Sequence, residues 1–302
     1  MLKGRDLISL MEYKPKEIKQ IIDLGIKVKK KPKRYSNSLR QKTLAMIFAK
    51  TSTRTRVSFE AGMTQLGGHA IYLDWRTTNL TKGRIEEEIR CIERYVDIIM
   101  ARVYKHDEIK AIAEASKKPV INALCDLFHP CQALADLMTI REKKGKTKGI
   151  KIAYVGDGNN VCNSLAICGA KLGAEISIGM PKGYEPLKIA IDDAKAYSKV
   201  TLYNSAEEAI KDVDVVYTDT WVSMGQEEET EKRLKIFPPF QVNPRLMSLA
   251  KRDALFMHCL PAHVGQEVTE EVLYSPNSVV FDQAENRMHV QKALMLLLLG
   301  KA

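Results

Sequence analysis

The sequence predicts an α/β protein of two doubly wound domains, each a mainly parallel sheet with helices on both faces. Three observations support this. Short apolar runs alternate with longer segments whose apolar residues recur at helical spacing. The short runs are hydrophobic almost throughout, as strands buried on both faces are. A polar, glycine-punctuated stretch, 141–149, interrupts the rhythm near mid-chain, and the same pattern then begins again.

The first half opens with an amphipathic helix expected at 14–30, whose Ile and Leu residues form one stripe. Strands and helices then alternate up to a long helix expected from 129 to about 143. Gly67 and Gly68 mark the end of one of these helices. The strands of this half are predicted at 43–48, 69–73, 97–101 and 119–122, with helices at about 53–66, 85–95 and 107–115.

The second half repeats the arrangement, starting with a strand, a tight turn at 156–160 and a helix at 161–172. We expect a first domain at 1–146, a second at 147–283, and a C-terminal helix within 284–302 that packs back on the first. Further strands are predicted at 150–155, 175–179, 200–203, 213–218, 254–258 and 278–282, and the final helix at 285–299.

Composition restricts the function classes. The 302 residues are 45% hydrophobic and 28% charged, as in a globular protein, and no apolar run reaches the ~20 residues of a membrane span. A net charge of +10 favours anionic partners, but the basic residues are dispersed, so nucleic acid and membrane partners are not expected. The first residues lack the apolar core of an export signal and the cysteines lack paired spacing, so we expect reduced thiols in the cytoplasm. The cysteines are 91, 125, 131, 162, 168 and 259.

The stretch with the strongest chemical signal follows the strand expected at 43–48. It begins a helix, where free backbone N–H groups and the helix dipole favour an anion. Hydroxyl and guanidinium groups alternate there, and forked guanidinium groups can bind phosphate oxygens in pairs. We therefore predict a phosphate site from Ser52, Thr53, Arg54, Thr55 and Arg56. The alternative is an ordinary helix cap followed by two solvated arginines.

Other polar residues follow the predicted strands or begin the long helix of the first half. In open parallel sheets, ligands lie beyond the carboxyl ends of the strands, so we expect these residues to line a site between the two domains. They are Arg102, His129, Gln132, Asn159, Asn160, Asp219, Ser223, His258 and Cys259.

Several short motifs, in order along the chain, resemble the aspartate/ornithine carbamoyltransferase family. Ser-Thr-Arg-Thr-Arg at 52–56, Met-Ala-Arg at 100–102 and His-Pro-Cys-Gln at 129–132 are similar to its carbamoyl-phosphate half. Gly-Asp-Gly-Asn-Asn at 156–160, Asp-Thr-Trp-Val-Ser-Met-Gly at 219–225 and His-Cys-Leu-Pro at 258–261 are similar to its ornithine branch. The resemblance covers essentially the whole chain.

The resemblance implies transfer of the carbamoyl group of carbamoyl phosphate to the side-chain amine of L-ornithine, giving citrulline and phosphate. It implies no cofactor and no metal. By resemblance, the carbamoyl-phosphate residues are Ser52, Thr53, Arg54, Thr55, Arg102, His129, Gln132, Cys259, Leu260 and Arg287. Those for ornithine are Asn160, Asp219, Ser223 and Met224, and those acting in catalysis are Thr55, Arg102, His129, Asp219 and Cys259.

The family also implies a homo-oligomer, a trimer or a multiple of trimers, with sites at subunit interfaces. One loop departs from the family pattern. Residues 80–86 differ from the usual Gly-Glu-containing form and are one residue shorter. In the family this loop reaches into the site of the neighbouring subunit. Because the residues here differ, the family's contact at that site is not carried over to them.

Each candidate also has a structural interpretation. His129 precedes a proline and would cap a helix, and Cys259 between apolar residues would be a buried small side chain. Asp219 would cap a strand end, Arg287 would support a helix, and Asn159 with the residue after it would form an Asx turn.

Three other functions compete with the family reading. Gly156-x-Gly158 after a strand suggests a dinucleotide site, but the third glycine position is Val161 and the strand at 175–179 ends without an acid. His258, Cys259 and His263 suggest zinc, without a matching carboxylate. A non-catalytic binding homologue would bind carbamoyl phosphate yet form no citrulline. Within the family, putrescine, N-acylated ornithine and aspartate are the competing acceptors.

Overall fold

The computed structural model describes residues 2–223 and 227–302, and the chain divides into two compact units. Unit 1 is Met1–Met138 together with Glu285–Ala302, and unit 2 is Thr139–Ala284. The two divisions fall inside helices α6 (Pro130–Lys144) and α13 (Val280–Leu298). No helix in the described part of the chain combines the length and apolar character that crossing a membrane requires.

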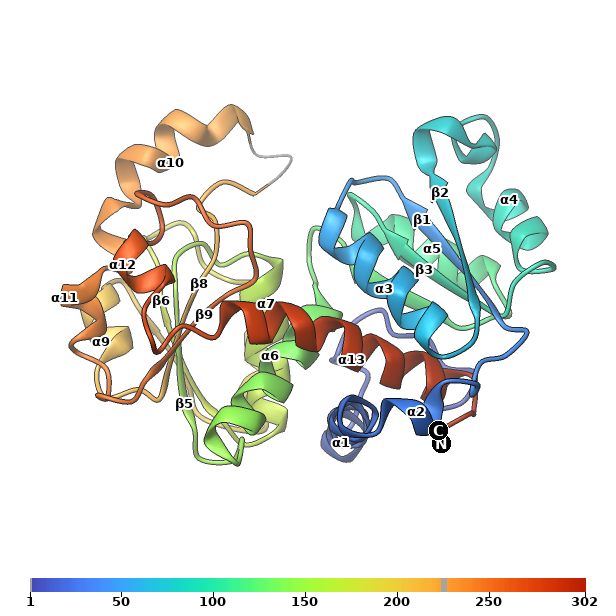
Figure 1. Ribbon diagram of the computed structural model, residues 1–302. Coiled ribbons are helices and arrows are strands. Elements are labelled where there is room, and N and C mark those ends of the chain that lie inside the picture. Colours follow the sequence, from blue (N-terminus) through green and yellow to red (C-terminus); the bar gives the residue numbers. More distant parts are fainter. Residues whose placement is uncertain (1, 224–226) are drawn as a thin grey trace. The chain divides into compact units, whose positions relative to one another are not determined.

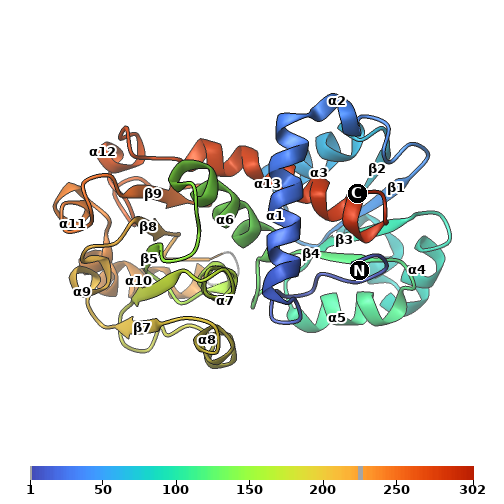
Figure 2. The same ribbon diagram turned by 90° about the horizontal axis from the view of Figure 1, so that it is seen from below.

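Unit 1 contains a parallel sheet in the order β2-β1-β3-β4. Strands β1, β3 and β4 are almost entirely buried, because helices cover both faces of the sheet, whereas the edge strand β2 is partly exposed (Figures 1 and 2). Helix α3 lies on one face and helices α4 and α5 on the other, as right-handed crossovers require when the strand order reverses. The bounds are β1 (Thr43–Phe48), β2 (His69–Asp74), β3 (Ile98–Arg102), β4 (Val120–Leu124), α1 (Pro15–Lys30), α2 (Pro32–Tyr35), α3 (Thr53–Gln65), α4 (Ile85–Ile92) and α5 (His106–Ala115).

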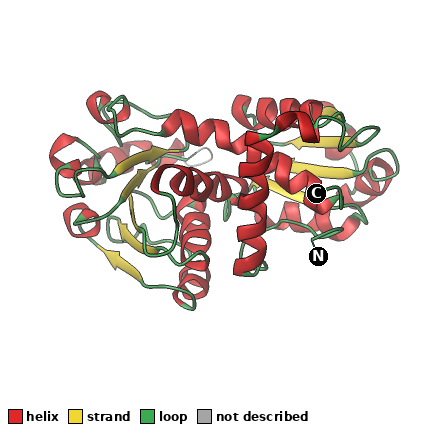
Figure 3. Ribbon diagram, turned by 60° about the horizontal axis from the view of Figure 1, so that its bottom comes forward, coloured by secondary structure: helices red, strands yellow, loops and turns green. Residues whose placement is uncertain are grey.

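Unit 2 contains a second parallel sheet, in the order β7-β6-β5-β8-β9. Helices again flank the strands (Figure 3). The chain runs outward from β5 to β7, then returns to the other side of β5 to form β8. The strands are β5 (Lys151–Val155), β6 (Glu175–Gly179), β7 (Val200–Tyr203), β8 (Val215–Thr218) and β9 (Leu255–His258). The helices are α7 (Asn160–Lys171), α8 (Lys188–Lys195), α9 (Ala206–Ile210), α10 (Thr230–Ile236), α11 (Pro244–Met247) and α12 (Glu270–Leu273).

The predicted fold class is confirmed, since both units are parallel sheets flanked by helices. In each unit the strand order reverses between two central neighbours, β1 and β3 in unit 1 and β5 and β8 in unit 2. Crevices at such reversals are where open α/β sheets bind ligands. The loops that follow these strands are therefore the part of each unit in which to look for a site.

The predicted strand at 278–282 is wrong. Ser278 forms only an isolated bridge with Phe256, and helix α13 already begins at Val280 rather than at 285. The run is β-branched and short, but it precedes a long apolar helix and places Asp282 in its first turn, where the helix dipole favours an acid. Tertiary packing and helix continuity outweigh the local strand preference here.

Candidate active site

The turn between β1 and α3 builds an anion-binding helix start in unit 1. Ser52 is the N-cap of α3, and its Oγ accepts a hydrogen bond from the Thr55 backbone N–H at 3.2 Å. Thr53 is exposed and Arg54 is half-buried in the first turn. The remaining N–H groups and the positive end of the helix dipole suit an anion.

A buried hydroxyl joins three elements next to this turn. The Thr55 side chain is fully buried, and its Oγ1 accepts hydrogen bonds from Arg287 Nη2 on α13 at 2.9 Å and from Arg102 Nη1 at 3.5 Å. Arg102 ends β3, where the parallel register pairs it with Phe48 at the end of β1. Residues far apart in sequence therefore place two guanidinium groups on one hydroxyl.

His129 lies in the field of these cations. Its side chain is 3% exposed. Burial first, then the charges of Arg287, Arg102, Lys50 and Arg54, holds its pKa well below the usual 6.5. The ring is therefore neutral at neutral pH and keeps one N–H to donate.

The pKa of His129 gives the free energy of unfolding a pH dependence. Because the unfolded chain binds this proton more readily, the contribution of His129 is complete above pH 6.5 and is lost as the pH falls below it. One such group changes stability by at most about 1.4 kcal/mol per pH unit. In urea unfolding at pH 7 and pH 5, the variant His129→Gln should lose less stability on acidification than the wild type.

The difference between the two proteins isolates His129. Other groups that titrate in this range, such as Asp157, act equally in both. Equal losses in wild type and variant would contradict a depressed pKa at His129.

Gln132 lies near His129, in the first turn of α6, and is 1% exposed. Its Nε2 donates to Asp136 Oδ1 at 2.8 Å, one turn later. Among the described residues, its Oε1 has no hydrogen-bond partner. An unsatisfied buried acceptor costs about 1–3 kcal/mol, so a ligand N–H at this oxygen would recover that energy.

Arg56 has different surroundings from the rest of the stretch. It forms an ion pair with Glu60 at 3.2 Å, and both side chains are close to half exposed. Its guanidinium carbon also lies 4.0 Å from the centre of the Tyr72 ring. These contacts engage Arg56 away from the Thr55 hydroxyl, so we do not include it in the candidate site.

Lys50 is a cation that the sequence reasoning did not assign to the site. It is 8% exposed, and its Nζ lies 5.6 Å from the centre of the Tyr104 ring. Its charge acts on His129. The available signal was its position at the start of the same stretch, two residues after β1.

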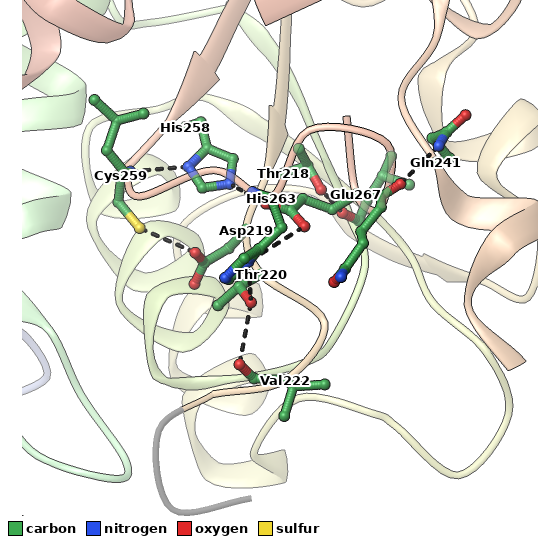
Figure 4. Close-up of polar contacts among 12 residues, drawn as sticks. Thr218, Asp219, Thr220, Val222, Gln241, His258, Cys259, His263 and Glu267 are labelled. Atoms are coloured by element: carbon green, nitrogen blue, oxygen red, sulfur yellow. Dashed lines mark hydrogen bonds and ion pairs between the residues drawn. The ribbon is translucent and has the colours of Figure 1, made fainter. Parts of the chain in front are cut away.

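In unit 2, the ends of β8 and β9 place Asp219 beside Cys259 (Figure 4). Thr218 and His258, the last residues of these strands, are paired in register, so the residues after them adjoin. The Cys259 thiol donates to Asp219 Oδ1 at 3.0 Å. Asp219 Oδ2 accepts from Asn159 Nδ2 at 2.8 Å, which connects the loops after β8 and β5.

The other residues predicted for ornithine lie in the same loops. Asn160 is the first residue of α7 and Ser223 follows Asp219 by four residues, and both are half-buried. Met224 lies outside the described residues. Asn159, which we expected either to line the site or to form a turn, caps α7 through its Oδ1 and binds Asp219 through its Nδ2.

A buried arginine that the sequence reasoning missed supports two of these loops. Arg233 on α10 is 4% exposed, lies 3.1 Å from Asp157 Oδ2, and donates to the Trp221 carbonyl oxygen at 2.8 Å. Burial raises the pKa of Asp157 to about 6, although Arg233 opposes the shift. Nothing in the sequence distinguishes Arg233 from the charged residues on either side of it, so its burial could not be predicted.

The structure corrects one premise of the zinc alternative. A carboxylate does accompany the His258–Cys259 pair, because ligand atoms of Asp219, His258 and Cys259 lie within 4.8 Å of one another. However, both ring nitrogens of His258 have partners: Nδ1 accepts from the Leu260 N–H at 2.8 Å, and Nε2 lies 3.1 Å from Glu267 Oε1. A metal would have to displace one of these bonds, so the geometry does not favour a metal centre.

The dinucleotide alternative is also disfavoured by local geometry. A Cβ added at Gly158 would lie 2.3–2.6 Å from the backbone of residues 184–186. The Gly158 N–H donates to the carbonyl oxygen of residue 184 at 3.0 Å. The chain's own close approach therefore requires this glycine, and the space beside it is filled by protein.

Comparison with known proteins gives the family. The model of the aspartate/ornithine carbamoyltransferase carbamoyl-P binding domain matches residues 5–142, and that of the Asp/Orn binding domain matches residues 148–298. This chain belongs to the aspartate/ornithine carbamoyltransferase family. The resemblance found in the sequence motifs is thereby confirmed.

Relatives within this family match over nearly the full chain. Ornithine carbamoyltransferase of Pyrococcus horikoshii is 54% identical over 99% of this chain and 97% of the relative, and that of Bacillus subtilis is 50% identical over 99% and 95%. The solved structure of ornithine carbamoyltransferase from Pyrococcus furiosus has a TM-score of 0.95 at 53% identity and covers 99% of this chain and 98% of its own. The fold described above, with its two parallel sheets, therefore matches that of a solved family member over nearly the whole chain.

Proposed function

We propose that this protein transfers the carbamoyl group of carbamoyl phosphate to the side-chain amine of L-ornithine, giving citrulline and phosphate. The observation that carries the proposal is the buried Thr55 hydroxyl, which accepts from Arg102 and Arg287 beside a neutral, buried His129. Full-length relatives named ornithine carbamoyltransferase support the choice of acceptor. A relative in Pyrococcus furiosus is named anabolic, which favours a role in arginine biosynthesis.

In the proposed reaction, the start of α3 holds the phosphate. Backbone N–H groups and the side chains of Ser52, Thr53, Arg54 and Thr55 supply the donors. Phosphate is also the leaving group, so cations on its oxygens stabilise the charge that develops as the carbon–oxygen bond breaks. No covalent enzyme intermediate is needed.

The carbonyl oxygen is assigned to the donors around Thr55. Negative charge grows on this oxygen when the neutral amine attacks the carbonyl carbon. Arg102, His129 and Thr55 would donate to it, with Arg287 completing the cluster. A neutral His129 suits this role, because it donates one N–H without competing for the substrate proton.

The carbamoyl nitrogen is assigned to acceptors. Gln132 Oε1, buried and without a partner among the described residues, suits an N–H donor. The backbone at Cys259 and Leu260 would supply further contacts. These acceptors distinguish a carbamoyl group from an acetyl group, whose methyl would leave them unpaired.

The ornithine end is assigned to the loops of unit 2. Asp219 would pair with an ammonium group, and Asn160, Ser223 and Met224 would hold the rest of the amino-acid end. Cys259 lies on Asp219 Oδ1, so we place it beside the attacking amine. The second acid of aspartate would be repelled by Asp219, which disfavours aspartate as acceptor.

A citrulline-forming assay tests the proposal. Carbamoyl phosphate is supplied with ornithine, putrescine, N-acetylornithine or aspartate, and the carbamoylated product and released phosphate are both measured. We expect ornithine to give equal amounts of citrulline and phosphate and to exceed the other acceptors by at least a hundredfold in kcat/KM. Binding of carbamoyl phosphate without any carbamoylated product would indicate the non-catalytic homologue instead.

A trimer, or a multiple of trimers, and a cytoplasmic location are further parts of the proposal. The first is supported by membership of the family and the second by the six free cysteines, which are typical of a reducing compartment. Sedimentation equilibrium would test the assembly, and a single-chain mass would contradict it.

A further inference from the structure

We propose that Glu267 is a positioning residue, which holds the loops carrying Cys259 and Asp219 in register through a His258–Glu267–His263 cluster (Figure 4). His258 and Glu267 are buried, and His263 is exposed. This inference rests on the proposed function, because it concerns the precision with which those two loops meet the substrates. Glu267 itself contacts neither Asp219 nor Cys259, so its effect would act through the residues between them.

The first step is the carboxylate itself. Glu267 and His258 are both fully buried. Glu267 Oε1 receives two contacts, one from His258 Nε2 at 3.1 Å and one from the His263 backbone N–H at 2.7 Å. Among the described residues, its Oε2 has no hydrogen-bond partner. A buried carboxylate is costly unless donors reach it, so the two bonds at Oε1 are what hold this side chain in place.

The second step is the tautomer of His258. Its Nδ1 accepts a hydrogen bond from the Leu260 backbone N–H at 2.8 Å, so the hydrogen resides on Nε2 and points to Glu267. Leu260 adopts a φ of 59°, which a branched side chain rarely favours. The bond to His258 therefore helps to hold the backbone just after Cys259 in an unfavourable conformation.

The third step reaches the other loop. The Thr220 hydroxyl donates to the Val222 carbonyl oxygen at 3.1 Å, so its oxygen accepts from His263 Nδ1 at 3.2 Å. His263 belongs to the segment after β9, and Thr220 directly follows Asp219. Glu267 is thus linked through His258 to Leu260, the residue after Cys259. It is linked through His263 to Thr220, the residue after Asp219.

The consequence is a defined separation of the two groups assigned to the amine. Cys259 Sγ and Asp219 Oδ1 are 3.0 Å apart. Cys259 follows His258 of the cluster, and Asp219 precedes Thr220, which His263 contacts. A displacement of about 1 Å at a reacting group can cost up to 10²-fold in rate. Loss of the Glu267 acceptor should therefore reduce turnover while the phosphate residues of unit 1 stay intact.

The test compares two variants of Glu267. Glu267→Met removes both side-chain oxygens at similar volume, whereas Glu267→Gln keeps one oxygen that can accept the hydrogen bonds. Glu270→Met is the matched control, since Glu270 is exposed three residues later. We expect Glu267→Met to lower kcat about tenfold. Glu267→Gln should recover to within threefold of wild type, and the control should be unchanged. The Kd for inorganic phosphate should stay within twofold in all three.

A merely structural role would lower the melting temperature of Glu267→Met without changing kcat per folded molecule, and that result would overturn the proposal. If Glu267→Met does not fold, Thr220→Val carries the test from the other end of the cluster, with an expected threefold loss of kcat. Unchanged kcat in Thr220→Val would then overturn it. Absence of citrulline from both wild type and Glu270→Met would instead reject the proposed function.

Discussion

Replacing Arg102 with glutamine is expected to lower kcat for citrulline formation by about 10²- to 10³-fold. Loss of one preorganised donor to a developing oxyanion typically has this effect. Arg102 is 6% exposed and donates to the Thr55 hydroxyl, so its guanidinium is held at one position. Initial rates with saturating carbamoyl phosphate and ornithine would measure the change.

Unfolding is not the expected cause of this loss. Arg102 shares the neighbourhood of His129 with other cations, so removing one charge relieves repulsion. Arg102→Lys, which restores the charge but not the fork, should lie between wild type and Arg102→Gln. The exposed Arg90→Gln serves as the control and should match wild type. A kcat within threefold of wild type in Arg102→Gln would remove this residue from the catalytic set.

Asp219→Asn is expected to raise the KM for ornithine roughly 10- to 100-fold. The carboxylate accepts from the Cys259 thiol and from Asn159 Nδ2, and in the proposal it also pairs with an ammonium group. A hydrogen bond to a charged group contributes about 1.5–3 kcal/mol, which corresponds to this range. Asparagine keeps the shape of the side chain, but it has a single side-chain oxygen and cannot accept both of these hydrogen bonds.

The readout separates substrate binding from damage to the site as a whole. The Kd for inorganic phosphate should remain within twofold, because phosphate is assigned to unit 1. Asp212→Asn, an exposed position in the turn before β8, is the matched control and should leave the ornithine KM unchanged. An unchanged ornithine KM in Asp219→Asn would show that the acceptor binds elsewhere.

Much of the fold followed from short-range sequence patterns. Apolar runs at 43–48 and 150–155 predicted the parallel strands β1 and β5, and the hydroxyl-rich stretch from Ser52 predicted the start of α3. These features are encoded within windows of about ten residues, because periodicity and capping are local properties. The failure at 278–282 came from the same source, since a β-branched run cannot reveal that a long helix begins within it.

The candidate site was only partly accessible in this way. Ser52, Thr55, Arg102 and His129 could be named from motifs, because each follows a strand or begins a helix. Arg56 belongs to the same motif but pairs with a surface glutamate, a distinction that depends on which way the helix faces.

What the sequence determined by itself was the class of fold, the family motifs and the kinds of chemical group available. Only the tertiary structure decided which charged groups are buried together. Glu267 and Arg233 are acidic and basic residues among many others in the chain, and their burial depends on strands and loops distant in sequence. Burying an ion is favourable only where partners converge on it, and that convergence is a property of the folded chain.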